Sequence, residues 1–280
     1  MTCLVKYLRV GQCRHLECIA ARSGRLAMID FPSFCGLIQH PHAGWILFDT
    51  GYAEHFFTAT AKLPQRLYRT ALPINLPKEE VLLNQLTALG LTACDISAVI
   101  VSHYHGDHVA GLRDFPRATF FAGKVATQEI QSFAKTPWQA TLAGKLPGLL
   151  PDDFEKRINY IDDYPTINLP EWMQPFSQGF DLLGDASLIA ISLPGHSAGQ
   201  MGLLIPDADG RPVFMAADAC WSLPACKEGR LPSVLTNFFA PHGKAYEKTF
   251  IQLGQLAKRE PEIRILPSHC ESSWRLFKDE

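Results

Sequence analysis

Short apolar runs bounded by turn residues recur along the chain, and this pattern predicts a sheet-rich α/β fold. Several of the runs are apolar at almost every position, which is typical of strands buried on both faces. Residues 41–44, Pro-His-Ala-Gly, predict a hairpin turn between two of them. The expected strands are residues 4–10, 35–40, 45–49, 96–101, 118–121, 187–193, 212–217 and 263–266.

Helical periodicity is clearest over residues 78–89, where Pro77 precedes the pattern and Gly90 follows it. A second helix is expected over residues 123–133. Two stretches, 61–77 and 136–179, interrupt this alternation and are rich in Pro and aromatic residues. Loops of this length within a compact domain are usually functional. We expect both to cover a substrate pocket within one domain spanning residues 1–280, with surface excursions or subunit contacts as the alternative.

Composition narrows the class of protein. The chain has 280 residues, of which 47% are hydrophobic and 19% charged, so it can bury a substantial core. The net charge of −2 and the scattered basic residues give no electrostatic footprint for nucleic acid. No apolar run approaches the roughly 20 residues of a membrane span, and the N-terminus lacks a signal-peptide pattern, so a cytoplasmic location is expected. The eight cysteines, without a C-x-x-C pair, are expected to be reduced thiols.

Metal-binding chemistry is concentrated in residues 103–108, His-Tyr-His-Gly-Asp-His, directly after the strand expected over 96–101. In an extended segment alternate side chains share a face, so we expect His103, His105 and Asp107 to converge while His108 leaves at a different angle. Imidazoles and carboxylates suit zinc, iron or manganese. Four such side chains within six residues can hold two ions.

Further candidate ligands follow other expected strands. His196 follows the strand over 187–193, Asp218 follows 212–217, and His269 follows 263–266. Loops at strand ends commonly carry function on a rigid scaffold. Each of these residues has an ordinary loop role as its alternative, and the repeated arrangement favours a metal site. Cys220 and Cys270 each lie within two residues of a candidate ligand. We interpret them as buried thiols, with thiolate ligands as the alternative. The pair His40 and His42 flanks a proline and is expected to form a turn.

Together these residues resemble the signature of the metallo-β-lactamase superfamily, and Asp49-Thr50-Gly51 matches the strand and turn that precede it. The resemblance implies an α/β fold, a four-layer αβ/βα sandwich with two mixed β-sheets and metals at one edge. It implies that Asp218 bridges two metals, along with a hydroxide, and that Asp49 orients a ligand, unless Asp49 merely forms the turn. The first metal would be held by His103, His105 and His196, and the second by Asp107, His108 and His269.

Within the superfamily the chain looks most similar to the N-acyl-homoserine lactonase group, which implies ring-opening hydrolysis of a small lactone or ester. Zinc is the expected metal, with iron and manganese as alternatives, and Asp107 would pass a proton to the leaving group. That group often has a Tyr three residues after the bridging Asp, where this chain has Trp221. We interpret Trp221 as an apolar wall of the substrate pocket, with a catalytic role for its indole N–H as the alternative, and His242 as a second pocket residue.

Other functions remain open from the sequence. A thioesterase of the glyoxalase II type or a phosphodiesterase would use the same ligands, and the non-enzymatic alternative is a metal-binding sensor or pseudoenzyme. The expected partner is a small-molecule substrate, with no nucleic acid and no membrane. Whether the chain forms a homodimer is left open.

Overall fold

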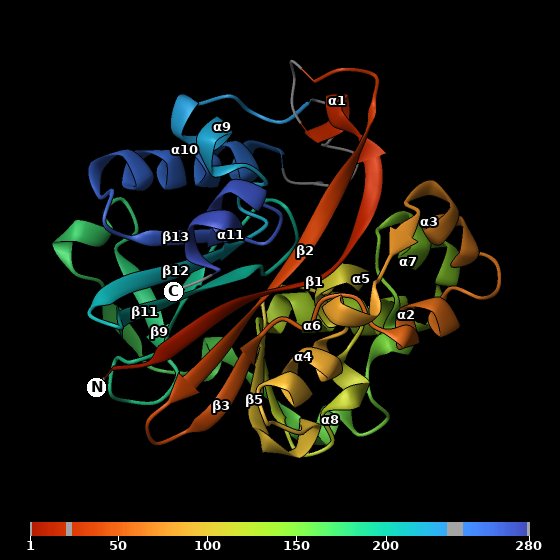
Figure 1. Cartoon of the computed structure of the whole chain (residues 1–280), viewed down its shortest axis with the longest axis horizontal. Helices are drawn as coiled ribbons and strands as arrows, with labels where there is room; N and C mark the ends of the chain where they lie inside the picture. The colour runs from red at the N-terminus through yellow and green to blue at the C-terminus, as the bar shows by residue number, and fades with distance from the viewer. Residues whose placement is uncertain (1, 21–23, 234–242, 279–280) are drawn as a thin grey trace.

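The computed structural model describes residues 2–20, 24–233 and 243–278. Two mixed β-sheets pack face to face, and helices cover the outer side of each sheet (Figure 1). The expected four-layer αβ/βα sandwich is therefore confirmed. In the described ranges, no helix combines the length and the apolar character needed to cross a bilayer.

The first sheet has the strand order β4-β1-β2-β3-β5-β6-β7. Strands β1, β2 and β3 pair antiparallel, and β3, β5, β6 and β7 pair parallel. Parallel strands need crossover connections, which here place helices on the outer face. The strands are β1 Leu4–Leu16, β2 Met28–His40, β3 Gly44–Phe48, β4 Ile74–Asn75, β5 Ile96–Val101, β6 Thr119–Ala122 and β7 Ile158–Tyr160.

The second sheet has the strand order β13-β12-β11-β10-β9-β8. Its neighbours are antiparallel except for β12 and β13, which are parallel and are connected through the longest helix, α10. The strands are β8 Thr166–Asn168, β9 Gln178–Asp181, β10 Ile189–Ser192, β11 Met201–Ala208, β12 Arg211–Ala217 and β13 Arg264–Pro267.

The helices lie on the two outer faces of the sandwich and at its edges (Figure 1). Helix α10 packs one side against the second sheet and buries Phe250, Leu253 and Leu256 there. The α-helices are α1 Glu17–Ala20, α2 Glu54–Ala59, α3 Arg66–Ala71, α4 Leu82–Ala88, α5 Gly106–Val109, α6 Lys124–Ser132, α7 Pro137–Leu142, α8 Phe154–Arg157, α9 Leu223–Glu228, α10 Gly243–Arg259 and α11 Glu271–Phe277.

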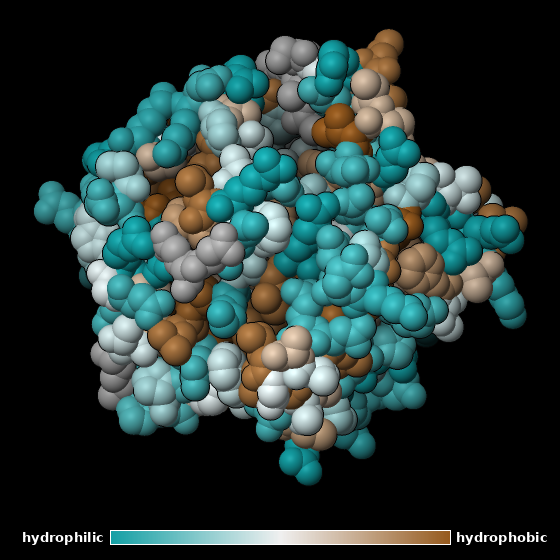
Figure 2. Space-filling view, in the orientation of Figure 1, coloured by the Kyte–Doolittle hydropathy of each residue, from teal (hydrophilic) through white to brown (hydrophobic). Residues whose placement is uncertain are grey.

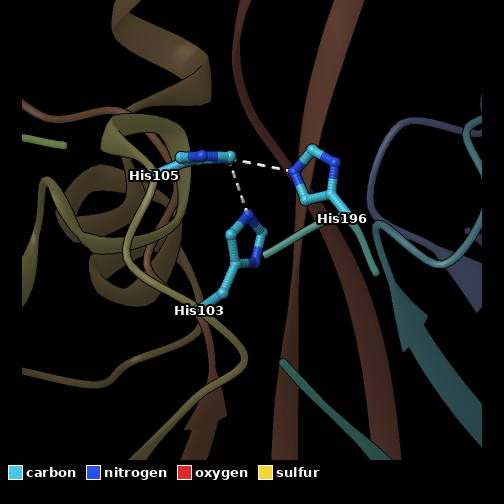
Figure 3. Close-up of side chains that lie close together, drawn as sticks. All are labelled: His103, His105 and His196. Carbon is cyan, nitrogen blue, oxygen red and sulfur yellow. Dashed lines mark hydrogen bonds between the residues drawn. The ribbon is translucent and has the colours of Figure 1, made fainter. Parts of the chain in front are cut away.

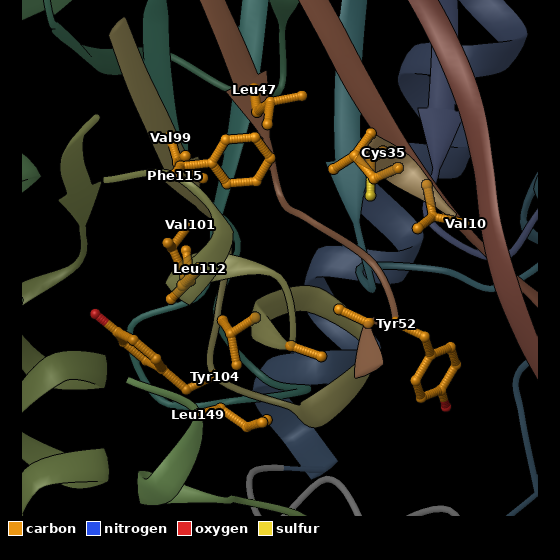
Figure 4. Close-up of a cluster of buried hydrophobic side chains, with 14 of the residues drawn as sticks. Val10, Cys35, Leu47, Tyr52, Val99, Val101, Tyr104, Leu112, Phe115 and Leu149 are labelled. Atoms are coloured by element: carbon orange, nitrogen blue, oxygen red, sulfur yellow. The ribbon is translucent and has the colours of Figure 1, made fainter. Parts of the chain in front are cut away.

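Alternate residues of the central strands enter different layers of the core. In β5, Val99 and Val101 join the outer layer under the helices, whereas Ile100 lies between the sheets. Figure 4 shows the outer layer, where these valines face Phe115 and Leu112. Burial on both faces explains why these strands are continuous apolar runs. In the view of Figure 2, hydrophilic residues dominate the face and hydrophobic ones lie in separate groups among them.

Three sequence predictions differ from the structure. Strands β1 and β2 extend well beyond the ranges expected for them. The helix expected over 78–89 is split, because Val81 is extended (ψ 122°) between a 3₁₀ turn, Lys78–Glu80, and α4. The stretch 136–179, expected to be an irregular cover, contains β7, β8 and the first half of β9, so it supplies the edge strands β7 and β8 of the two sheets. Short edge strands carry little periodicity, which is why the pattern missed them.

Candidate metal centre

The side chains predicted as metal ligands gather at one edge of the sandwich, at the ends of strands from both sheets. His103 and His105 follow β5, and His196 follows β10. Asp218 comes directly after β12, and His269 comes two residues after β13. Asp107 and His108 lie in the short helix α5. Because strands of both sheets end at this edge, residues far apart in sequence meet there.

Three histidines form the first cluster (Figure 3). His105 Nδ1 lies 3.0 Å from His103 Nε2 and 2.9 Å from His196 Nε2, so three ring nitrogens face one another. Burial is the largest cause of a pKa well below the ordinary value at His103 and His105, and it lowers the pKa of His196 to about 4. The three imidazoles are therefore neutral at physiological pH, which is the form that binds a metal.

The second cluster consists of Asp107, His108 and His269. Asp107 Oδ2 lies 3.4 Å from His269 Nε2 and 3.7 Å from His108 Nε2. The expectation that Asp107 converges with His103 and His105 is wrong, because residues 106–109 form a helical turn instead of an extended segment. That turn directs Asp107 toward His108 and His269.

Asp218 lies between the two clusters. Its Oδ2 is 3.2 Å from His196 Nε2 and 3.1 Å from His269 Nε2, and its Oδ1 is 3.4 Å from His108 Nε2. Burial alone would raise the pKa of Asp218, but the imidazoles of His269 and His108 hold it well below the ordinary value. One ionised carboxylate thus faces histidines of both clusters.

Hydrogen bonds from residues behind the ligands determine which ring nitrogens of His103 and His108 face the centre. Asp49 Oδ2 lies 2.7 Å from both His108 Nδ1 and Ser102 Oγ, and Ser102 Oγ lies 3.0 Å from His103 Nδ1. With Asp49 as acceptor, each Nδ1 carries the proton and each Nε2 keeps its lone pair for the centre. Asp49 has φ 62°, in the left-handed region that Asp tolerates in turns, so it both forms the turn and contacts His108.

Two further contacts were not predicted from the sequence. The carbonyl oxygen of Pro32, in β2, lies 2.6 Å from His269 Nδ1 and so orients that ring. The indole N–H of Trp221 donates to Asp218 Oδ2 over 3.0 Å. A main-chain carbonyl has no sequence signal, whereas Trp221 was predicted to line the substrate pocket and not to contact a ligand. Its ring also packs edge-on against Phe31, with centroids 5.4 Å apart.

The loop carrying His196 depends on Gly195. Its φ is 134°, and a Cβ there would lie 2.2 Å from backbone atoms of Tyr246 in α10. Only glycine permits both this conformation and this approach. Helix α10 therefore packs directly against the loop and fixes the position of the His196 backbone.

Orphaned polar atoms provide a test of whether a metal fits. His108 Nε2 and Asp218 Oδ1 are buried without a hydrogen-bond partner, although they face each other at 3.4 Å. Buried polar groups normally have partners, and leaving one unpaired costs about 1–3 kcal/mol. An imidazole nitrogen and a carboxylate oxygen that face each other in this way are atoms that a divalent cation can bind together. The nitrogen and oxygen donor set fits such an ion.

The remaining sequence candidates lie elsewhere. Cys220 and Cys270 are buried free thiols and belong to none of the ligand groups among the described residues. Burial raises the pKa of Cys220 well above the ordinary value, which keeps it protonated. His40 Nδ1 accepts the backbone N–H groups of His42 and Ala43, as expected of a turn. His242 lies outside the described residues.

Residues 28–269 match the family described as the metallo-beta-lactamase superfamily. Because this match covers most of the chain, the protein belongs to the metallo-beta-lactamase superfamily. Its predicted class, a metallo-hydrolase, is confirmed with the family.

Several individual proteins are similar to this chain. It is 28% identical over 261 residues to the N-acyl homoserine lactonase AttM of Agrobacterium fabrum, covering 93% of this chain and 90% of the relative. Its fold is similar to that of Bacillus thuringiensis AiiA with N-decanoyl-L-homoserine at the active site (TM-score 0.70, 17% identity, 99% and 97% coverage). It is also similar to AidC, described as a dizinc quorum-quenching lactonase (TM-score 0.61, 17% identity, 95% and 87% coverage).

Proposed function

We propose that this protein is a hydrolase with two divalent metal ions that opens the lactone ring of an N-acyl homoserine lactone. The observation that carries the proposal is a carboxylate, Asp218, shared between two ligand clusters within 3.1–3.4 Å of their nearest histidine nitrogens. The first ion would be held by His103, His105 and His196, the second by Asp107, His108 and His269, and both by Asp218.

When bound, the two ions would polarise the ester carbonyl and lower the pKa of a shared water, so that hydroxide is available at neutral pH. Side chains of the protein would carry out the proton transfer and hold the ligands in position. Asp107 is the most exposed of the second cluster, at 12%, against 1% and 2% for His108 and His269. A carboxylate that is partly open to solvent can accept a proton and deliver it to the leaving alkoxide. Asp49, which contacts His108, and Trp221, which donates to Asp218, would hold these two ligands in place.

Relatives support the choice of lactone and zinc. AttM, named as a lactonase, is similar to this chain along nearly its whole length, and AidC is described as dizinc. The donor set of imidazoles and carboxylates accepts zinc readily and iron or manganese as well. A thioester or phosphodiester substrate is the alternative for the same centre.

A substrate panel tests the proposal. Purified protein loaded with zinc, iron or manganese would be assayed against N-acyl homoserine lactones of several chain lengths, an acyl thioester and a phosphodiester, with metal content measured in parallel. The proposal expects two ions per chain and lactone turnover that Asp218→Ala abolishes. Turnover of the thioester or phosphodiester without the lactone would overturn the substrate, and wild-type activity in metal-free protein would overturn the mechanism.

A further inference from the structure

A buried lysine and a partly exposed glutamate form an ion pair beside the first histidine cluster, and this pair has no part in the chemistry described above. The side chain of Lys145, which follows α7, is only 4% exposed and forms an ion pair with Glu129 of α6. Burial lowers the pKa of Lys145, and Glu129 opposes this effect. Burying a lysine is costly unless it is paired, so its place here calls for a reason.

Lys145 contacts the segments that carry two of the three histidines. Its Nζ lies 3.0 Å from the hydroxyl of Ser197, the residue after His196. Its backbone pairs with that of His105 in an isolated antiparallel bridge. The preceding residue, Gly144, lies so close that a Cβ there would be 3.3 Å from the His105 ring. Lys145 therefore connects a segment from the end of β5 in the first sheet to a segment from the end of β10 in the second.

We infer that Lys145, paired with Glu129, is a positioning residue that holds the His105 and His196 segments together so that their ring nitrogens converge. This inference rests on the proposed function, because it takes His105 and His196 as ligands of the first ion. Residues that support ligands from outside typically contribute 10- to 100-fold to metal affinity.

Positioning and simple charge repulsion predict opposite changes in metal affinity when Lys145 is removed. Lys145 is one of the groups that lower the pKa of His105, after burial and His196, so its positive charge acts on the first cluster. A positive charge beside a divalent ion opposes binding, and removing it should tighten binding if charge alone matters. Positioning predicts the opposite result, because loss of Lys145 separates the two segments.

The experiment measures zinc affinity by competition with a chromophoric chelator for the wild type, Lys145→Met, Ser197→Ala and the double variant. Methionine keeps much of the apolar stem without the charge. The matched control is Lys124→Met, which removes a lysine of α6 that is 46% exposed and pairs with Asp163 at 3.7 Å. Cobalt-substituted absorption spectra report the ligand geometry of the first ion independently of activity.

We expect both single variants to bind the first zinc about tenfold or more weakly. The double variant should be no worse than the weaker single, and Lys124→Met should equal the wild type. Altered cobalt bands should accompany the loss. Unchanged or tighter binding in Lys145→Met would overturn the inference while leaving the proposed function intact. If Lys145→Met does not fold, unchanged affinity in Ser197→Ala would overturn it. Wild-type protein that binds no zinc would overturn the proposed function together with this inference.

Discussion

The indole N–H of Trp221 is the donor whose removal should affect the centre most selectively. It donates to Asp218 Oδ2 over 3.0 Å, and the residue is only 9% exposed. Trp221→Phe keeps an aromatic ring near Phe31 and His196 but deletes the donor. We expect weaker metal binding and lower turnover in this variant.

The magnitude follows from the charge and burial of the acceptor. Hydrogen bonds to charged groups contribute about 1.5–3 kcal/mol, which corresponds to roughly 10- to 150-fold in an equilibrium constant. Asp218 has other neighbours, since His269 Nε2 and His196 Nε2 lie within 3.2 Å of the same oxygen. These contacts retain part of its orientation, so the lower end, about tenfold in zinc affinity, is expected.

The assay combines chelator competition for zinc with kcat and KM for the best lactone of the panel. Trp138→Phe serves as the control, because it is the same substitution at a site 58% exposed in α7. If Trp221 is only an apolar wall, as the sequence favours, zinc affinity and kcat stay at wild-type values and only KM rises. That result would refute the role assigned to the hydrogen bond.

Three further predictions concern the ligands and their loops. Asp218→Ala should lose about tenfold or more activity beyond Asp107→Asn in steady-state assays, because Asp218, unlike Asp107, faces both clusters. Burial lowers the pKa of His108 and His269, but nearby carboxylates outweigh it and raise both. Metal binding there should release protons and weaken as pH falls, which calorimetry in two buffers measures. Gly195→Ala should destabilise the fold by about 1–3 kcal/mol or more in urea unfolding.

Central strands could be predicted from the sequence because burial on both faces makes them continuous apolar runs. Strand β5 was predicted with its observed bounds, and β12 differed by one residue. The predictions did not include β11 or α10, although the buried residues Tyr246, Phe250 and Leu253 recur with helical spacing. Edge strands such as β8 are too short to show a period, and their pairing depends on the neighbouring strand.

The candidate ligands could be identified from residue type and position after strands, because strand ends converge in a sandwich. The spacing of residues 103–108 did not give their grouping, since it depends on whether residues 106–109 are extended or helical, and only the family resemblance implied it. The contacts that support the ligands could not be predicted from the sequence either. Pro32 and His269 are 237 residues apart in sequence, and the partner is a main-chain carbonyl. Lys145 appeared within a stretch expected to be an irregular cover, with no signal for its ion pair with Glu129.

The central claim is a pair of metal sites that share Asp218. Its most direct test is the anomalous difference map of a crystal of zinc-loaded protein, recorded on both sides of the zinc edge. The account predicts two peaks per chain, one among His103 Nε2, His105 Nδ1 and His196 Nε2, and one among Asp107, His108 and His269, each bound by Asp218. A single peak in fully loaded protein, or two peaks with Asp218 bound to only one, would contradict it.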